Sequence, residues 1–170
     1  MRDTENVQGL LGGAAVGVAA TMTMDVVMVA AAKLAPDVFA SEKNSPEAIG
    51  RWADGLCRGR WRFEDMSAEP PVRGELWIGL AAHYLTGVML TEVYLTAVRR
   101  GGLRPGVAGA TAYGIATAVL PLLLMYPSMG YGCCGRQSGD ARRLVGSMLL
   151  GHAAFGAGIG LWAAATRRTG

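Results

Sequence analysis

The sequence predicts an all-α protein: a four-transmembrane-helix bundle with a short interfacial helix in the loop between spans one and two. Of the 170 residues, 51% are hydrophobic and only 17% are charged, whereas soluble domains average about 25% charged residues. The apolar residues gather in four runs, each long enough to cross about 30 Å of hydrocarbon. Basic residues stand mostly between or beside these runs, where lipid headgroups lie. One membrane domain, 1–170, is therefore predicted, with spans at about 8–32, 75–98, 105–126 and 143–166.

Each run is bounded by residues that stop a membrane helix. The first stops at Lys33, and the second ends at Arg99-Arg100-Gly101-Gly102. The third begins at Arg104-Pro105, because proline is favourable at a helix start. The fourth opens after Arg142-Arg143 and closes at Arg167-Arg168. Four crossings place both termini on the same side of the membrane.

The one long connection is the polar loop 36–73, which is predicted to contain an amphipathic helix. Ser45-Pro46-Glu47 supplies an N-cap serine, a proline in the first turn and an acid near the positive end of the helix dipole. Apolar residues then recur at helical spacing from Ile49 to Cys57. Such a helix lies on the membrane surface, either as a lid over a cavity or as a connector anchored by aromatic residues such as Trp52.

The charge distribution bears on partners and orientation. The formal net charge of +3 comes from 16 basic and 13 acidic residues, spread along helix ends and not gathered in a groove for nucleic acid. The expected partner is therefore the lipid bilayer, with no nucleic acid. Basic residues in short segments beside the spans weigh more than those in the long loop, so we expect cytoplasmic termini.

Small residues recur at every fourth position in each run, as they do where membrane helices pack closely. The four rows are Gly9, Gly13, Gly17, Thr21 and Asp25; Glu75, Gly79, His83, Gly87 and Thr91; Gly106, Ala110, Gly114 and Ala118; and His152, Gly156 and Gly160. Glycine-rich faces beyond those that four helices use internally would favour a homodimer.

Ionisable side chains continue three of these rows, so they should face the bundle interior and not lipid. Counted inward from the loop-side ends at about 1.5 Å per residue, each lies about 10 to 12 Å deep. The predicted polar layer consists of Asp25, His83 and His152, with Thr21, Tyr113 and Thr117 as further candidates. The predicted loop-side rim consists of Arg51, Trp52, Glu75 and Tyr126.

Four roles are open to this layer, because a carboxylate at such depth is costly unless it is paired, neutralised or hydrated. The four roles are a set of hydrogen bonds that fixes the register of the helices, a transition-metal site, a haem site with two axial histidines, and a cavity for a proton or a small ligand. A metal would take Asp25, His83 and His152 as ligands. No nucleophile motif accompanies the histidines, so hydrolase chemistry and catalytic residues are not predicted. We expect a non-catalytic module without a cofactor, and a metal- or haem-binding oxidoreductase is the alternative.

The three cysteines, Cys57 and the pair Cys133-Cys134, fall on the loop side. One disulfide is open to them if that side is the outer face. Adjacent cysteines rarely bond each other and the sequence has no CxxC motif, so the sequence favours neither redox catalysis nor zinc binding by the cysteines, and ordinary buried or reduced thiols are the expected state.

Short motifs follow one another along most of the chain. They are Ala20–Asp25, Gly50-Arg51-Trp52, Gly74-Glu75, Ile78-Gly79, His83-Tyr84, Pro121, Tyr126–Gly130, Gly151-His152 and Phe155-Gly156. In their order and spacing the chain resembles DUF2938, a family of small bacterial membrane proteins of unknown function. The resemblance implies a four-helix integral protein of the bacterial inner membrane, and it implies no substrate or cofactor. Cys133-Cys134 stands where small residues are expected in the family, so a role for these cysteines would be peculiar to this chain.

Overall fold

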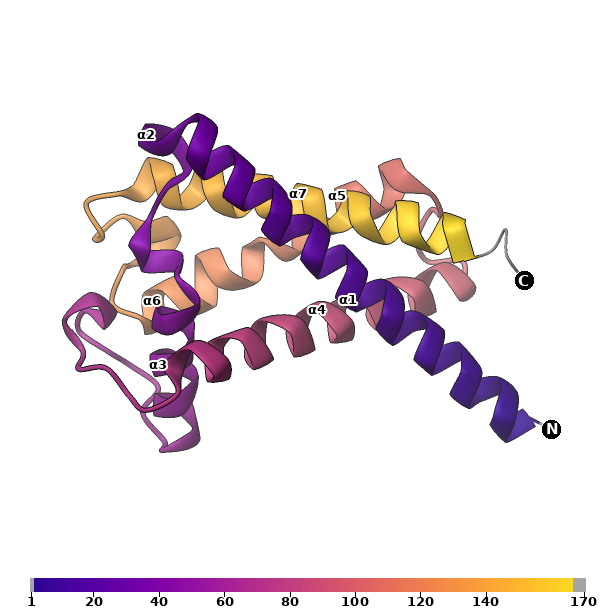
Figure 1. The fold of residues 1–170 in the computed structure, drawn as a ribbon, viewed down its shortest axis with the longest axis horizontal. Helices are drawn as coiled ribbons and strands as arrows, with labels where there is room; N and C mark the ends of the chain where they lie inside the picture. The colour runs from indigo at the N-terminus through magenta and orange to yellow at the C-terminus, as the bar shows by residue number, and fades with distance from the viewer. Residues whose placement is uncertain (1, 167–170) are drawn as a thin grey trace. The chain divides into compact units, whose positions relative to one another are not determined.

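The computed structural model describes residues 2–166, and for residues 2–10 it describes the backbone alone. Within this range the chain is helical and contains no strand, which confirms the all-α prediction. The elements, in chain order, are α1 (Arg2–Leu34), α2 (Pro36–Phe39), η1 (Glu42–Asn44), α3 (Pro46–Cys57), η2 (Met66–Ala68), α4 (Glu75–Arg99), α5 (Val107–Thr117), η3 (Pro121–Met125), α6 (Tyr126–Ser128), η4 (Cys133–Gly135) and α7 (Ala141–Thr166) (Figure 1).

Four helical segments are long and apolar enough to cross a membrane, as predicted. They are Leu11–Leu34, Glu75–Arg99, Val107–Ser128 and Ala141–Thr166. The predicted closure of the last span at Arg167-Arg168 lies outside the described residues.

Two predicted helix starts are corrected. The third span begins at Val107 and not at Pro105, because Gly106 adopts φ +100° and its carbonyl accepts the first helical hydrogen bond, from the Ala110 amide at 3.0 Å. The fourth begins at Ala141, before the two arginines, because the Asp140 carbonyl already accepts from the Leu144 amide at 3.0 Å.

The third span is interrupted in its second half, which the sequence pattern did not predict. Pro121 lacks the amide hydrogen that a continuing α-helix would donate. A five-residue π-helical turn, η3, follows at this proline and leads into α6. The third apolar segment is therefore built from α5, a π-helical turn and the short α6.

The helix predicted in the long loop is confirmed as α3. The Ser45 hydroxyl accepts a hydrogen bond from the Ala48 amide at 3.2 Å, and Pro46 occupies the first turn. One detail differs, because the buried positions are Ala48, Gly50 and Gly55, whereas Cys57 is exposed. The position of α3 on a membrane surface stays a prediction.

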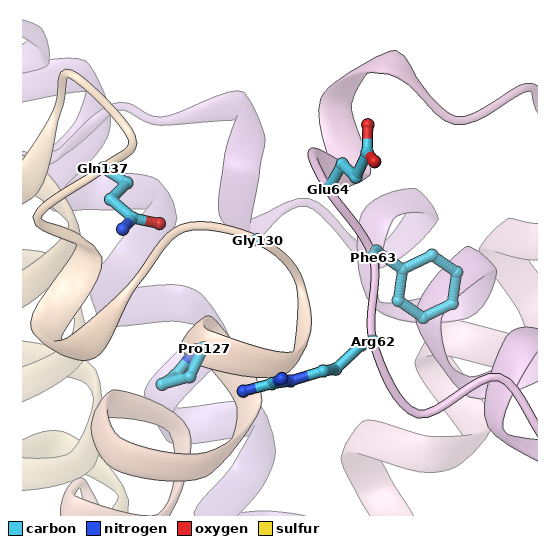
Figure 2. A pocket seen from close by; sticks show the side chains of 6 residues that line it. All are labelled: Arg62, Phe63, Glu64, Pro127, Gly130 and Gln137. Atoms are coloured by element: carbon cyan, nitrogen blue, oxygen red, sulfur yellow. The ribbon is translucent and has the colours of Figure 1, made fainter.

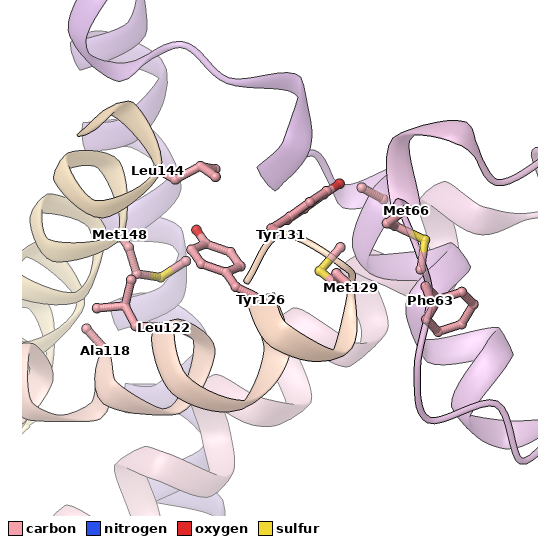
Figure 3. Packing of buried hydrophobic residues seen from close by; sticks show 10 residues of the cluster. Phe63, Met66, Ala118, Leu122, Tyr126, Met129, Tyr131, Leu144 and Met148 are labelled. Atoms are coloured by element: carbon pink, nitrogen blue, oxygen red, sulfur yellow. The ribbon is translucent and has the colours of Figure 1, made fainter. Parts of the chain in front are cut away.

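The described chain forms two compact units, each with its own core. The first contains residues 2–27, 84–116 and 151–166, and the second contains residues 28–83 and 117–150. The core of the first unit consists of Val16, Ala20, Tyr94, Ala110, Phe155 and Ile159. The core of the second is built around Tyr126, Tyr131, Met66, Met129 and Leu144 (Figure 3). Organisation as a single domain stays a prediction.

In the first unit, α5 and α7 touch backbone to backbone along the predicted small-residue rows (Figure 1). A Cβ added to Gly114 would overlap the His152 carbonyl oxygen, and one added to Gly156 would overlap the Ala110 carbonyl oxygen. A Cβ on Gly160 would lie 2.5 Å from the Val107 Cα. No side chain fits between these helices, so the glycines set their spacing.

Close packing at glycines also joins α1 to α4 within the first unit. A Cβ on Gly17 would lie 2.8 Å from the Val88 Cα, and one on Gly87 would overlap the Thr21 hydroxyl. Thr21 is 1% exposed. The predicted rows of the first and second spans therefore meet, and they carry Thr21 into the helix contact.

These contacts generate a matched prediction within α7. Gly156→Ala should lower stability by about 1 to 3 kcal/mol, because the added methyl group meets backbone that must move. Gly146→Ala, where no atom lies within 4 Å of the new methyl group, should be neutral or stabilising by up to about 1 kcal/mol. Thermal unfolding of the purified protein in detergent measures both. Equal effects of the two alanines would contradict close packing at Gly156.

Candidate functional site

The acid predicted inside the first span is hydrogen-bonded by a tyrosine. The Tyr84 hydroxyl on α4 donates to Asp25 Oδ2 on α1 at 2.8 Å, and both side chains are half-buried. Asp25 lies nine residues from Leu34, and Tyr84 lies nine residues from Glu75. At about 1.5 Å per residue, both lie about 13 Å inside the loop-side ends of their spans. The sequence pattern identified Asp25 as a site residue but missed Tyr84, although the His83-Tyr84 motif contained it.

The two histidines are half-buried on different helices. His83 lies on α4 in the second unit, and His152 lies on α7 in the first unit, to which Asp25 also belongs. The layer of Asp25, His83 and His152 stays a prediction. Among the side chains that the structure describes, in residues 11–166, no group of three or more His, Cys, Asp or Glu gathers as a metal site would require. The metal- or haem-binding alternative therefore gains no support.

The remaining layer candidates take part in helix contacts. The Thr21 hydroxyl donates to the Gly17 carbonyl at 2.9 Å. The Tyr113 hydroxyl donates to the Leu90 carbonyl at 2.8 Å and so ties α5 to α4. Thr117 is 8% exposed and belongs to the second unit. A role for these three in ligand binding stays a prediction.

A second acid lies in the contact between α1 and α4. The Glu92 carboxyl packs on Gly13, where a Cβ would overlap its Oε1 atom. Glu92 Oε1 is buried without a hydrogen-bond partner, and Oε2 lies 4.0 Å from Nη2 of Arg99. Glycine at position 13 thus makes room for a carboxyl group near the other end of the span.

Two predicted rim residues form an ion pair in the second unit. Arg51 Nε lies 3.1 Å from Glu75 Oε2, and the side chains are 17% and 16% exposed. Arg51 Nη1 also donates to the Glu69 carbonyl at 2.9 Å, while Glu75 Oε2 accepts from the Val72 amide at 3.0 Å. The pair thus fastens both α3 and the loop that follows it to the start of α4.

Glycines allow α3 to lie directly on α4. A Cβ on Gly50 would overlap the Glu75 carbonyl oxygen, and one on Gly79 would overlap the Pro46 carbonyl oxygen. The arginine that follows Gly50 is brought to its acid by this close approach.

The loop after α3 is bonded to the end of the third span. The Trp52 indole donates to the Ser128 hydroxyl at 2.9 Å, and that hydroxyl donates to the Trp61 carbonyl at 2.7 Å. The Phe63 amide donates to the Ser128 carbonyl at 2.8 Å. Ser128 thus holds two separate segments of the loop.

Two buried tyrosines complete this region (Figure 3). The Tyr126 hydroxyl donates to Asn44 Oδ1 at 2.7 Å, and Asn44 Nδ2 donates to Ser147 Oγ at 3.1 Å. The Tyr131 ring packs edge-on to that of Tyr126 at 6.1 Å, and burial raises the pKa of the Tyr131 phenol. The Lys43 ammonium lies 5.5 Å from the Tyr131 ring centroid. We call the set Asn44, Arg51, Trp52, Glu75, Tyr126 and Ser128 the cap cluster.

Motifs that stand far apart in the sequence thus meet in the second unit, among them Gly50-Arg51-Trp52, Gly74-Glu75 and Tyr126–Gly130. The family model described as "Protein of unknown function (DUF2938)" matches residues 14–167, nearly the whole chain. The chain belongs to this family. No curated protein and no solved structure matches the chain.

All four predicted rim residues lie in the second unit of this DUF2938 chain, and their role as the rim of a site stays a prediction. The sequence pattern missed the other two members of the cap cluster. Asn44 and Ser128 act through side chains whose partners come from distant segments. Ser128 lies inside the Tyr126–Gly130 motif, whereas no signal in the sequence pointed to Asn44.

An open hollow of about 450 Å³ lies beside the cap cluster of this DUF2938 member (Figure 2). Its lining residues are Arg62, Phe63, Glu64, Pro127, Gly130 and Gln137. None of the predicted layer residues lines it.

Two ion pairs that differ in exposure, Arg51 with Glu75 and Arg60 with Glu69, give a matched prediction for this family member. Glu75→Gln should lower stability by about 1 to 3 kcal/mol, since it leaves the mostly buried Arg51 without its anion, a loss that reaches about 3 to 5 kcal/mol at full burial. Arg60→Gln removes the pair of Arg60 with Glu69 at 2.8 Å, in which the arginine side chain is 53% exposed, and should cost less than about 1 kcal/mol. Thermal unfolding in detergent compares them. A larger loss for Arg60→Gln would contradict this ranking.

Proposed function

We propose that this chain is a non-catalytic, multi-pass module of the bacterial inner membrane, with cytoplasmic termini, that binds a proton or a small ligand at Asp25, His83 and His152. The hydrogen bond from Tyr84 to Asp25 supports this proposal best, because it fixes an acidic group well inside an apolar span. Intramembrane ionisable groups are costly and mark binding sites more often than chance would allow.

The chemistry of the donor matters for this argument. A tyrosine hydroxyl supplies a hydrogen bond but no positive charge, so this bond orients the Asp25 carboxyl without neutralising it. A carboxyl group oriented in this way can take up a proton or accept a hydrogen bond from an imidazole or a small ligand.

The histidines suit the same site by their register. His83 lies eight residues from Glu75, and His152 lies eleven residues from Ala141, the first residues of their apolar segments. At about 1.5 Å per residue, the depths are about 12 Å and about 16 Å, which differ by less than one turn of helix. An imidazole can accept a proton or donate a hydrogen bond to a carboxylate, so both side chains suit a proton-binding site.

The membrane partner follows from the same helices. We propose that the four apolar segments face the lipid bilayer. A homodimer through glycine-rich faces is also proposed, and Gly12 on α1, which has no atom within 4 Å of an added Cβ, leaves its helix face open to a second copy.

Infrared difference spectroscopy tests the proton site. Spectra recorded between about pH 5 and pH 8, the range in which histidine titrates, should contain a carboxyl signal that Asp25→Asn removes. Glu92→Gln is the matched control, because it neutralises the other acid of the contact between α1 and α4, and it should keep the signal. If the wild type lacks the carboxyl signal, or if Asp25→Asn leaves it unchanged, proton binding at Asp25 is refuted. If Asp25→Asn binds small molecules as the wild type does, the ligand site is refuted.

The histidines are tested by alanine substitution. His83→Ala and His152→Ala should each lower the melting temperature in detergent and shift the pH dependence of the Asp25 signal, because each removes a polar neighbour of the layer. Variants that melt like the wild type and leave the signal unshifted would show that the histidines are not part of this site. A Soret band in the purified protein, or a stoichiometric metal that is lost when Asp25, His83 or His152 is replaced, would overturn the non-catalytic proposal.

A further inference from the structure

The turn between α6 and α7 holds two thiols side by side. Cys133 and Cys134 lie in η4, and their Sγ atoms are 3.8 Å apart. Cys133 is exposed and Cys134 is partly exposed. The turn falls between the third and fourth apolar segments, which end at Ser128 and begin at Ala141. Both thiols are therefore accessible from outside the membrane spans.

The backbone holds this pair in an unusual conformation. Cys134 has φ +54°, and it is the one residue other than glycine with a positive φ in the described chain. Gly132 and Gly135 on either side also have positive φ, of +71° and +69°. The Gly135 amide donates to the Gly132 carbonyl at 3.0 Å, and the Arg136 amide donates to the Cys133 carbonyl at 3.2 Å. These bonds keep the two thiols on one short turn.

Packing below the turn adds to this rigidity. Cys134 packs against the core of the second unit, and Gly135 is buried against Leu144. The backbone amide of Gln137 donates to the Tyr131 carbonyl at 2.8 Å and so joins the residues that precede and follow the turn. A chelating pair held in place in this way loses little freedom when it binds.

The spacing of the sulfur atoms fits a cation better than a disulfide. Adjacent Cα atoms are about 3.8 Å apart, below the range of about 4.4 to 6.8 Å usual for disulfides. Two thiolates bound to Zn²⁺ at about 2.3 Å with a tetrahedral angle are separated by about 3.8 Å. The Sγ atoms already stand at this separation.

We propose that Cys133 and Cys134 form a two-thiolate site for a thiophilic divalent cation of the Zn²⁺ and Cd²⁺ class. The remaining coordination positions belong to water, because the described residues bring no third His, Cys, Asp or Glu side chain to a common metal site. Binding replaces two S–H bonds by two metal–sulfur bonds and releases two protons to solvent, so charge balances with no oxidant or reductant.

Cadmium titration of the purified protein in detergent tests the site, with a phosphine as reductant. The thiolate-to-Cd²⁺ charge-transfer absorption should saturate at one ion per chain, with close to two protons released in weak buffer. Cys133→Ser and Cys134→Ser should each abolish this absorption. Cys57→Ser should leave it unchanged, because the third thiol stands alone at the exposed end of α3.

Each other outcome overturns the proposal. If the wild-type protein lacks the charge-transfer absorption, the site does not exist. If each single variant keeps half of the absorption, the two thiols bind independently. If Cys57→Ser loses the absorption, the ion is bound elsewhere. Alkylation of the cysteines in the wild-type protein gives a second test that does not depend on whether the variants fold. Zn²⁺ should slow maleimide labelling of Cys133 but not of Cys57 in the same molecule, as read by peptide mass spectrometry, and equal rates at both cysteines would refute the site.

Discussion

The close approach of helix backbones at glycine is the constraint on which the rest of this structure depends. Burial against another helix gains little over burial in lipid, so membrane helices associate through close packing and hydrogen bonds. Gly114 and Gly156 join α5 to α7, and Gly17 and Gly87 join α1 to α4. Gly50 and Gly79 place α3 on the start of α4 in the same way. Because a polar residue that continues such a row is carried into the helix contact, the glycines also decide where Thr21 and Asp25 can lie.

Tyrosines then supply the hydrogen bonds that the apolar helices lack. All five tyrosines have a hydroxyl bonded outside their own helix or turn, to Asp25, Arg104, Leu90, Asn44 and Ser67. A tyrosine ring is compatible with an apolar interior, while its hydroxyl needs a partner when it is buried. Glycine brings two backbones together, and tyrosine fixes one against the other without adding a charge to the span.

Local signals account for the features that the sequence predicted. Hydropathy marked the four runs, Ser45-Pro46 marked the start of α3, and spacing by fours marked the helix contacts, since each of these signals acts within one or two turns of helix. The partners of Tyr84, Asn44 and Ser128 could not be read in this way, because each hydrogen bond joins segments that only the folded chain brings together. The turn at Pro121 was missed for a related reason: proline is tolerated in membrane spans when neighbouring groups satisfy the freed backbone, and the sequence does not reveal those neighbours.

The two acids that the sequence singled out stand at different depths in their spans and have different hydrogen-bond donors. Glu75 stands at the first residue of its span, where it faces an arginine and accepts from a backbone amide, so its charge is matched within the chain. Asp25 stands far inside its span and receives its hydrogen bond from a neutral phenol. Because the charge of Glu75 is matched by an ion pair within the chain, this acid fastens the loop to the start of α4. The proposed binding role of Asp25 rests instead on its depth in the apolar span and on the hydrogen bond that orients its carboxyl group.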